Sequence, residues 1–219
     1  MTALLGARSW RDARFAVLDF ETTGLDPSRD HILSFGVVPV EQGRALLAGT
    51  LYRVVRPPVA VPAESIRVHG LRPLDLERAP ALDEVGEELL EALAGRVLVA
   101  HAARIELSFL ERTYRRRGRR PPRRAIDVLG LAAELARSGH PARPSSPRLA
   151  DLAAAHGVPV ARTHHALADA LTTAQLFLVL ASELERRGGG SLRRLRRAGR
   201  SQNARSFFSD RLARTGPIA

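Results

Sequence analysis

Short apolar runs alternate with amphipathic stretches along most of the chain. The run at 15–20 (FAVLDF) favours a strand that is buried on both faces, and two further strands follow, so the chain opens with a β-meander. The predicted strands lie at 15–20, 31–40, 45–55, 96–100 and 125–128. The predicted helices lie at 83–94, 104–116, 129–137, 149–156 and 165–187.

Three strands followed by strands that alternate with helices predict an α/β domain built on a mixed sheet. Three consecutive glycines at 188–190 indicate the end of this domain. We therefore expect an N-terminal extension at 1–13, one folded domain at 14–187 and an arginine-rich C-terminal tail at 188–219. The tail could be partly helical, and the composition does not require it to be.

The charge of the chain is strongly positive and unevenly placed. All 34 basic residues are Arg against 23 acidic residues, which gives a net charge of +11. Residues 112–124 hold eight Arg and no acid, and residues 186–219 hold ten Arg and one acid; the remaining 16 Arg and 22 acids give −6. Such segments suit a polyanion such as nucleic acid, although solvated helix ends and tails often carry similar runs.

The composition also excludes several classes of site. The absence of Cys excludes disulfides, thiolate zinc sites and cysteine nucleophiles. The N-terminus does not have the pattern of a signal peptide, and the longest apolar run, at 176–181, is too short to span a bilayer. We therefore expect a soluble cytoplasmic protein.

Two carboxylates occupy an unusual position at the end of the first apolar strand. Asp19 and Glu21 are two residues apart, so both side chains point to the same face of the strand. Two neighbouring carboxylates near a core repel each other and lose hydration, and hard divalent cations such as Mg²⁺ commonly compensate for this. A strand that simply ends in solvent is the alternative interpretation.

Further acidic residues follow two later elements. Glu106 falls in the first turn of the helix that follows the strand at 96–100, and Asp169 lies five residues after His164 at the start of the long helix. Ligands gather at the carboxyl ends of strands in α/β sheets. Four carboxylates that converge there could hold two cations, and a neighbouring His could deprotonate a water that attacks an ester.

Three motifs in this order resemble the DEDDh family of 3′–5′ exonucleases. They are Asp19-x-Glu21-Thr-Thr-Gly-Leu, then HAARIELSFL with Glu106, then HHALAD with His164 and Asp169. The segments IRVHGLRP and AIDVLGLA also resemble parts of that family, and the likeness runs from about residue 15 to 185. The resemblance implies a ribonuclease H-like fold with a five-stranded mixed sheet flanked by helices, two Mg²⁺ or Mn²⁺ ions, and release of 5′-mononucleotides.

The resemblance also assigns roles. Asp19 would bridge both metals, Glu21 and Asp169 would bind the metal on the nucleophile side, Glu106 would be the remaining acidic ligand, and His164 would be the general base. The residues that resemble the family's contacts to the terminal nucleotide are Thr22, Thr23, Leu25 and His69. An ordinary polar turn, and a capping or packing role for His69, are the alternatives.

Two positions depart from the family pattern. Glu106 stands where the family usually has Asp, and Ala102 stands where it usually has Asn. The longer side chain moves the carboxylate by roughly 1.5 Å and still supplies an anionic oxygen, so we expect metal binding to persist. His101 is interpreted as a structural remnant of the motif.

Three functions remain open from the sequence. The first is a 3′–5′ exonuclease on the 3′ ends of single-stranded or frayed DNA, in proofreading or repair. The second is an exoribonuclease similar to ribonuclease T or oligoribonuclease. The third is a non-catalytic domain that binds nucleic acid, a DNA polymerase or a sliding clamp; QNARSFF at 202–208 is faintly similar to a clamp-binding peptide, but Arg205 occupies an apolar position of that motif.

Overall fold

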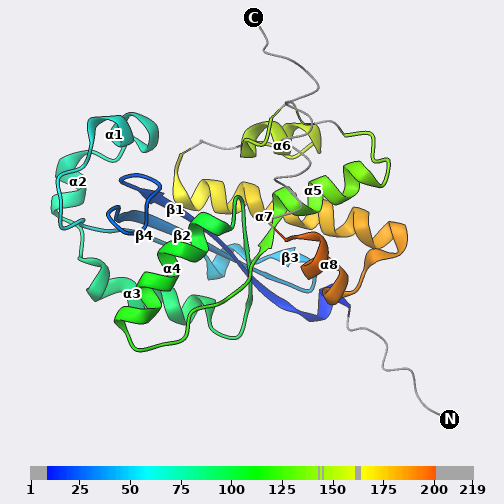
Figure 1. The fold of residues 1–219 in the computed structure, drawn as a ribbon, viewed down its shortest axis with the longest axis horizontal. Helices are drawn as coiled ribbons and strands as arrows, with labels where there is room; N and C mark the ends of the chain where they lie inside the picture. Colours follow the sequence, from blue (N-terminus) through cyan, green and yellow to red (C-terminus); the bar gives the residue numbers. More distant parts are fainter. Residues whose placement is uncertain (1–8, 143, 145, 161–163, 201–219) are drawn as a thin grey trace, which may run out of the picture.

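A computed structural model describes residues 9–142, 144, 146–160 and 164–200 of the chain. These residues form a mixed β-sheet with helices on both faces (Figure 1). The strands are β1 (Arg14–Thr22), β2 (Ile32–Glu41), β3 (Arg44–Ala45), β4 (Leu51–Val54), β5 (Val97–Ala100) and β6 (Ile126–Asp127). This confirms the predicted α/β class.

The sheet has the order β3-β2-β1-β5-β6, and β4 pairs with β2 beyond this path. β1 is antiparallel to β2 and parallel to β5, and β5 is parallel to β6. The described strands number six instead of the expected five, because the predicted strand at 45–55 is divided. A turn at Leu47–Gly49 separates β3 from β4, and each pairs with a different part of β2.

Helices cover the two faces of the sheet in separate groups. The described α-helices are α1 (Ala63–His69), α2 (Pro73–Glu77), α3 (Leu82–Leu93), α4 (Arg104–Arg116), α5 (Val128–Arg137), α6 (Leu149–Ala155), α7 (Ala166–Leu184) and α8 (Leu192–Ala198). α3 and α4 pack on the face that carries Leu18 of β1, and α5 to α8 pack on the face that carries Val17. Alternation along β1 therefore turns Asp19 and Glu21 toward α7.

Two short helices occur where the hydrophobic pattern predicts none. α1 and α2 lie between residues 56 and 82, and each spans fewer than eight residues. Gly70 ends α1 with a φ of 69°, and Pro73 begins α2. Such short segments, separated by a left-handed glycine, contain too few turns to show a helical period.

The long helix α7 is the central helix of one face. The segment 166–189 is long and apolar enough to cross a membrane by length and composition, and 56% of its apolar window is buried inside the protein. It packs on β1 and β2, and Phe177 lies against Phe15 and Trp10 with ring centroids 4.9 and 5.9 Å apart. We therefore interpret α7 as a core helix of the fold.

Segments at both ends of the domain also belong to the packed body. Trp10, in the predicted extension, is fully buried, and so is Leu195 of α8, in the predicted tail. α8 contacts α5 and β6, and the backbone N–H of Asp127 donates to the carbonyl of Gly199. The predicted clamp-like peptide at 202–208 lies outside the described residues. The division into extension, domain and tail stays a prediction.

Candidate active site

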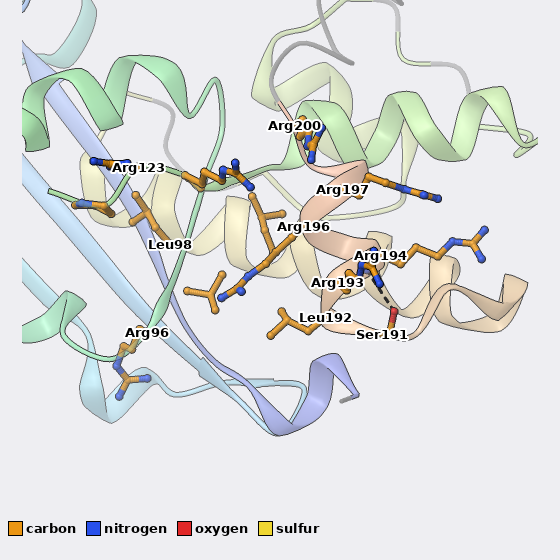
Figure 2. Close-up of a pocket in the computed structure, with 15 residues that line it drawn as sticks. Arg96, Leu98, Arg123, Ser191, Leu192, Arg193, Arg194, Arg196, Arg197 and Arg200 are labelled. Atoms are coloured by element: carbon orange, nitrogen blue, oxygen red, sulfur yellow. Dashed lines mark hydrogen bonds between the residues drawn. The ribbon is translucent and has the colours of Figure 1, made fainter. Parts of the chain in front are cut away.

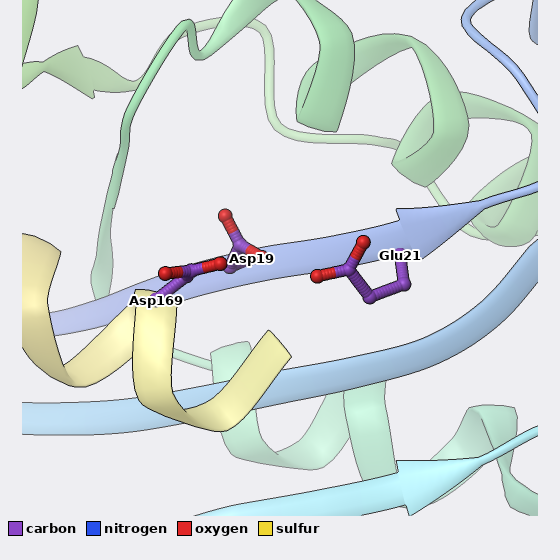
Figure 3. Close-up of side chains that lie close together, drawn as sticks. All are labelled: Asp19, Glu21 and Asp169. Carbon is purple, nitrogen blue, oxygen red and sulfur yellow. The ribbon is translucent and has the colours of Figure 1, made fainter. Parts of the chain in front are cut away.

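Three carboxylates meet at the carboxyl end of β1. Asp19 and Glu21 project from β1 toward the first turn of α7, which carries Asp169 (Figure 3). Oxygen atoms of the three side chains lie within 4.8 Å of one another. The sequence prediction that these residues converge is therefore correct in its geometry, although their role as ligands stays a prediction.

Gly36 of β2 allows the start of α7 to lie close to the sheet, and the sequence pattern did not identify this residue. It is paired with Asp19 across β1 and β2. A Cβ atom at this position would lie 2.5 Å from backbone atoms of Ala166 and Leu167, at the start of α7. A larger residue would thus push the N-terminal turn of α7 away from the sheet. A glycine inside an otherwise apolar strand is the signal that could have revealed this close approach.

Glu106 lies near the trio but does not belong to its closest set. It sits in the first turn of α4, is 5% exposed, and its Oε2 atom has no hydrogen-bond partner among the described residues. Burial, with the nearby charges of Asp127 and Glu21, raises the pKa of Glu106 to about 8. A buried, unpartnered carboxylate oxygen is an unfavourable arrangement that a cation would relieve.

Asp127 is a second residue that the sequence pattern did not assign to the site. Its Oδ2 accepts the backbone N–H of Ala103 at 3.2 Å, and its Oδ1 accepts the N–H of Leu129 at 3.0 Å. Ala103 is the residue before α4, so this buried carboxylate fixes the start of the helix that carries Glu106. We interpret Asp127 as a positioning residue.

Burial and mutual repulsion raise the pKa values of the acidic cluster. Burial, and then the charges of Glu106, Asp169 and Glu21, raises the pKa of Asp19 well above its usual value. Burial and the nearby Asp169 raise the pKa of Glu21 to about 7. In the described part of the chain none of these carboxylates forms an ion pair with an arginine. The oxygen-only set suits hard divalent cations.

His164 lies directly before α7 and contacts Asp169 of the cluster. Its backbone adopts a left-handed conformation with a φ of 60°, and its N–H donates to Asp169 Oδ2 at 2.7 Å. This contact partly offsets the burial that raises the pKa of Asp169. The His164 side chain is exposed, whereas the next residue, His165, stacks on Tyr52 of β4 with ring centroids 4.6 Å apart. The stack holds the start of α7 against β4.

The predicted substrate contacts have different surroundings. Leu25 is 72% exposed beside the cluster-bearing strand, whereas Thr22 donates to the carbonyl of Gly24. Thr23 is buried, and its hydroxyl donates to Asp30 and accepts the N–H of His31, so it supports the loop after β1. Substrate binding by Leu25 and by the two threonines stays a prediction.

His69 is buried at the end of α1. Its Nδ1 accepts the N–H of Leu71 at 3.0 Å, and its Nε2 has no partner among the described residues. Burial, together with the nearby charge of His164, lowers the pKa of His69. It therefore lies close to the proposed base, and both the capping role and the predicted contact with substrate are compatible with this position.

The motif before α4 contains one of the two departures from the family pattern, Ala102, and the histidine that precedes it. Ala102 has a φ of 53°, a conformation that Asn tolerates better than Ala, so the usual residue would suit this turn. His101 is half-buried, its buried Nδ1 atom has no partner among the described residues, and desolvation lowers its pKa to about 4. Its role as a structural remnant of the motif stays a prediction.

Comparison with known proteins places the fold and site in one class. The family described as "Exonuclease" matches residues 16–177. A DNA polymerase III subunit epsilon-like protein of Rhodobacter capsulatus is 34% identical over 85% of this chain and 27% of its own length. A 3′–5′ exonuclease DinG of Staphylococcus haemolyticus is 30% identical over 75% of this chain and 18% of its own length. The chain thus spans about a quarter or less of these relatives.

Solved structures show the same fold. An Escherichia coli exonuclease I complex with single-stranded DNA superimposes with a TM-score of 0.71 at 15% identity, covering 80% of this chain and 42% of that one. The nuclease domain of 3′hExo, a DEDDh family member bound to rAMP, gives a TM-score of 0.64 at 18% identity, covering 83% and 96%. The fold is that of ribonuclease H-like nucleases. The chain belongs to the exonuclease family.

Proposed function

We propose that this chain removes nucleotides one at a time from the 3′ ends of DNA single strands or frayed duplexes, in proofreading or repair, in the cytoplasm. The observation that supports it is the group of buried carboxylates, Asp19, Glu21, Glu106 and Asp169, that no arginine neutralises in the described structure. The DNA substrate rests on the epsilon-like relative and on the DNA-bound exonuclease I. A DNA polymerase or a sliding clamp is the proposed partner.

The four carboxylates would hold two Mg²⁺ or Mn²⁺ ions. When bound, such ions polarise a phosphodiester and lower the pKa of a water molecule. Asp19 would take part in holding these ions, because the charges of Glu106, Asp169 and Glu21 all act on its carboxylate. Glu21 and Asp169 face each other beside it, and Glu106 approaches from α4.

His164 would accept the proton of the attacking water. The residue is exposed, and its backbone is fixed by the hydrogen bond to Asp169 of the cluster. A proton acceptor at the edge of the cluster can pass the proton to solvent. Leu25 would contact the terminal base, because it is a large apolar side chain exposed beside β1.

An exoribonuclease is the second candidate. A structural neighbour in the same family is described with bound rAMP, and another recognises a histone mRNA stem-loop. The carboxylates would hold cations beside a phosphodiester in either case, so the acidic cluster does not favour one sugar.

One assay tests the proposal. DNA and RNA single strands of the same sequence, labelled at the 5′ end, are incubated with Mg²⁺, Mn²⁺ or chelator. We expect a ladder shortened from the 3′ end on DNA with either ion, and none with chelator or in Asp19→Ala. Faster shortening of RNA would transfer the proposal to the exoribonuclease, and cation-independent cleavage would contradict the mechanism.

A further inference from the structure

Most arginines outside one region of the surface are already engaged within the protein. Arg112 donates to the carbonyls of Pro27 and Asp30, Arg117 donates to that of Leu82, and Arg119 pairs with an acid. Much of the first basic segment therefore supports the fold. The arginines of a basic segment therefore do not form one continuous patch of positive charge on the surface.

The remaining parts of the two basic segments meet in one groove. Arg123 and Arg124 come from the strand-like approach to β6, and Arg193, Arg194, Arg196, Arg197 and Arg200 come from α8 and its end. The groove between them has a volume of about 1040 Å³ and continues to Arg96 before β5. Figure 2 shows arginine side chains on both sides of it, from α8 and from the segment with Arg123.

The lining has a simple chemical character. The described residues that line the groove include eight Arg, no acid and no aromatic side chain. Arg123, Arg193 and Arg196 are exposed and make no hydrogen bond or ion pair with the described residues, whereas Arg11, Arg53 and Arg72 elsewhere pair with acids. Uncompensated guanidinium groups on both walls favour an anionic ligand that continues along the groove.

We propose that this groove binds the sugar–phosphate backbone of a nucleic-acid strand away from the acidic cluster, an inference that rests on the proposed function for its choice of polyanion. The planar guanidinium fork matches a phosphate, and the lack of aromatic side chains in the described lining leaves no stacking platform for bases. Binding in the groove is therefore independent of base sequence and equal for DNA and RNA. The groove anchors the strand, and the carboxylates act on its 3′ end.

The sheet register gives the scale of the separation. Val97 at the groove pairs with Phe15, and Asp19 lies four residues further along β1. At about 3.3 Å per residue this is about 13 Å along the strand direction. A stacked nucleic-acid strand rises about 3.4 Å per nucleotide, so at least about four nucleotides are needed to reach from one site to the other.

The test measures binding in the catalytically inactive Asp19→Ala background, so that it does not depend on cleavage. The groove variant carries Arg123→Gln, Arg193→Gln and Arg196→Gln. The matched control carries Arg44→Gln, Arg78→Gln and Arg148→Gln, which remove the same charge at exposed positions outside the groove. Fluorescence anisotropy follows a labelled 30-nucleotide DNA or RNA strand between 50 and 200 mM salt, with melting curves to confirm folding.

We expect the groove variant to bind about tenfold or more weakly at low salt and the control to bind like the parent. Each lost phosphate contact lowers the slope of log K against log salt by about 0.7, so three lost contacts lower it by about 2. Replacement of the same three arginines by Lys should restore most of the slope, because the charge returns.

Three outcomes would overturn the proposal that the groove binds a nucleic-acid backbone. Superimposable slopes for the groove variant and the parent would remove it from nucleic-acid binding. An equal loss in the control would indicate general electrostatics. Loss of affinity for polyglutamate, with nucleic-acid affinity unchanged, would assign the groove to an acidic protein. Failure of the proposed function is distinguishable, since a wild-type protein that cleaves nothing would still give these binding slopes.

Discussion

At the scale of single residues, Asp19 is a carboxylate whose surroundings disfavour its charge. Burial and three neighbouring carboxylates destabilise its ionised form. Asp19→Asn removes this repulsion while keeping the shape. We therefore expect the variant to lose cleavage and, in chelator at neutral pH, to melt about 2–4 °C higher, which corresponds to about 1 kcal/mol. Melting curves in chelator and the end-labelled assay measure the two effects. A lower melting temperature would show that Asp19 has a favourable partner in the free protein.

Glu106 allows a second test at this scale. Glu106→Asp restores the usual family residue and should keep the rate within about tenfold, or about 1.4 kcal/mol of barrier, because the anionic oxygen remains. Glu106→Gln keeps the length and volume but removes the charge, and should be slower by a much larger factor. Single-turnover rates on DNA compare the two variants. Equal rates for Gln and wild type would mean that this carboxylate takes no part in the reaction.

The sequence predicted the convergence of the acidic residues better than their surroundings. Asp19, Glu21 and Asp169 could be placed together because period-two alternation and the order of motifs constrain them. The engagement of Thr23 by Asp30 and His31 depends on the closure of the loop after β1, which no local pattern reports. The proximity of Asp127 to Glu106 likewise depends on the pairing of β5 with β6.

At the scale of secondary-structure elements, the contact between β2 and α7 depends on Gly36. A Cβ there would overlap the backbone of Ala166 and Leu167. Gly36→Ala should therefore displace the start of α7 with Asp169, lower cleavage at least about tenfold, and destabilise the fold by about 1–3 kcal/mol through overpacking. Gly49→Ala, at an exposed turn where only a Pro39 side chain is close, is the control. Wild-type activity in Gly36→Ala would mean that α7 can shift without moving Asp169.

A substitution in α8 tests the prediction that the folded domain ends near residue 188. Leu195 is fully buried in the core that α5 and α7 share. Leu195→Ala should destabilise the protein by about 2–4 kcal/mol in denaturant unfolding, because it leaves a cavity in the core. Leu47→Ala is the control, since Leu47 is 63% exposed and should change stability by less than about 0.5 kcal/mol. A change in unfolding free energy as small as that of the control would mean that α8 belongs to a tail that does not stabilise the domain. The sequence pattern of 192–198 did not predict that this helix packs on the core, because four Arg surround its two buried positions.

At the scale of the whole molecule, folding and cation binding are linked through the acidic cluster. The unfolded chain separates Asp19, Glu106 and Asp169, so a divalent cation binds the folded state far better. Occupancy of one site at 100 times its dissociation constant adds about 2.7 kcal/mol, or roughly 5–11 °C in melting temperature for a chain of this size. We expect Mn²⁺ and Mg²⁺ to raise the melting temperature of wild type, and to have little effect on Asp19→Asn. NaCl at the same ionic strength is the control for the screening of charges by salt.

The size of this stabilisation should depend on pH in a defined direction. In chelator, the raised pKa values of Glu21, about 7, and Glu106, about 8, mean that stability is lost as pH rises from the ordinary carboxyl value through these values. Cations bind the deprotonated carboxylates and reverse that loss. The difference in melting temperature between cation and chelator should therefore grow from pH 5 to pH 8. A difference that stays constant over this range, or that persists in Asp19→Asn, would show that the cations bind elsewhere on the protein.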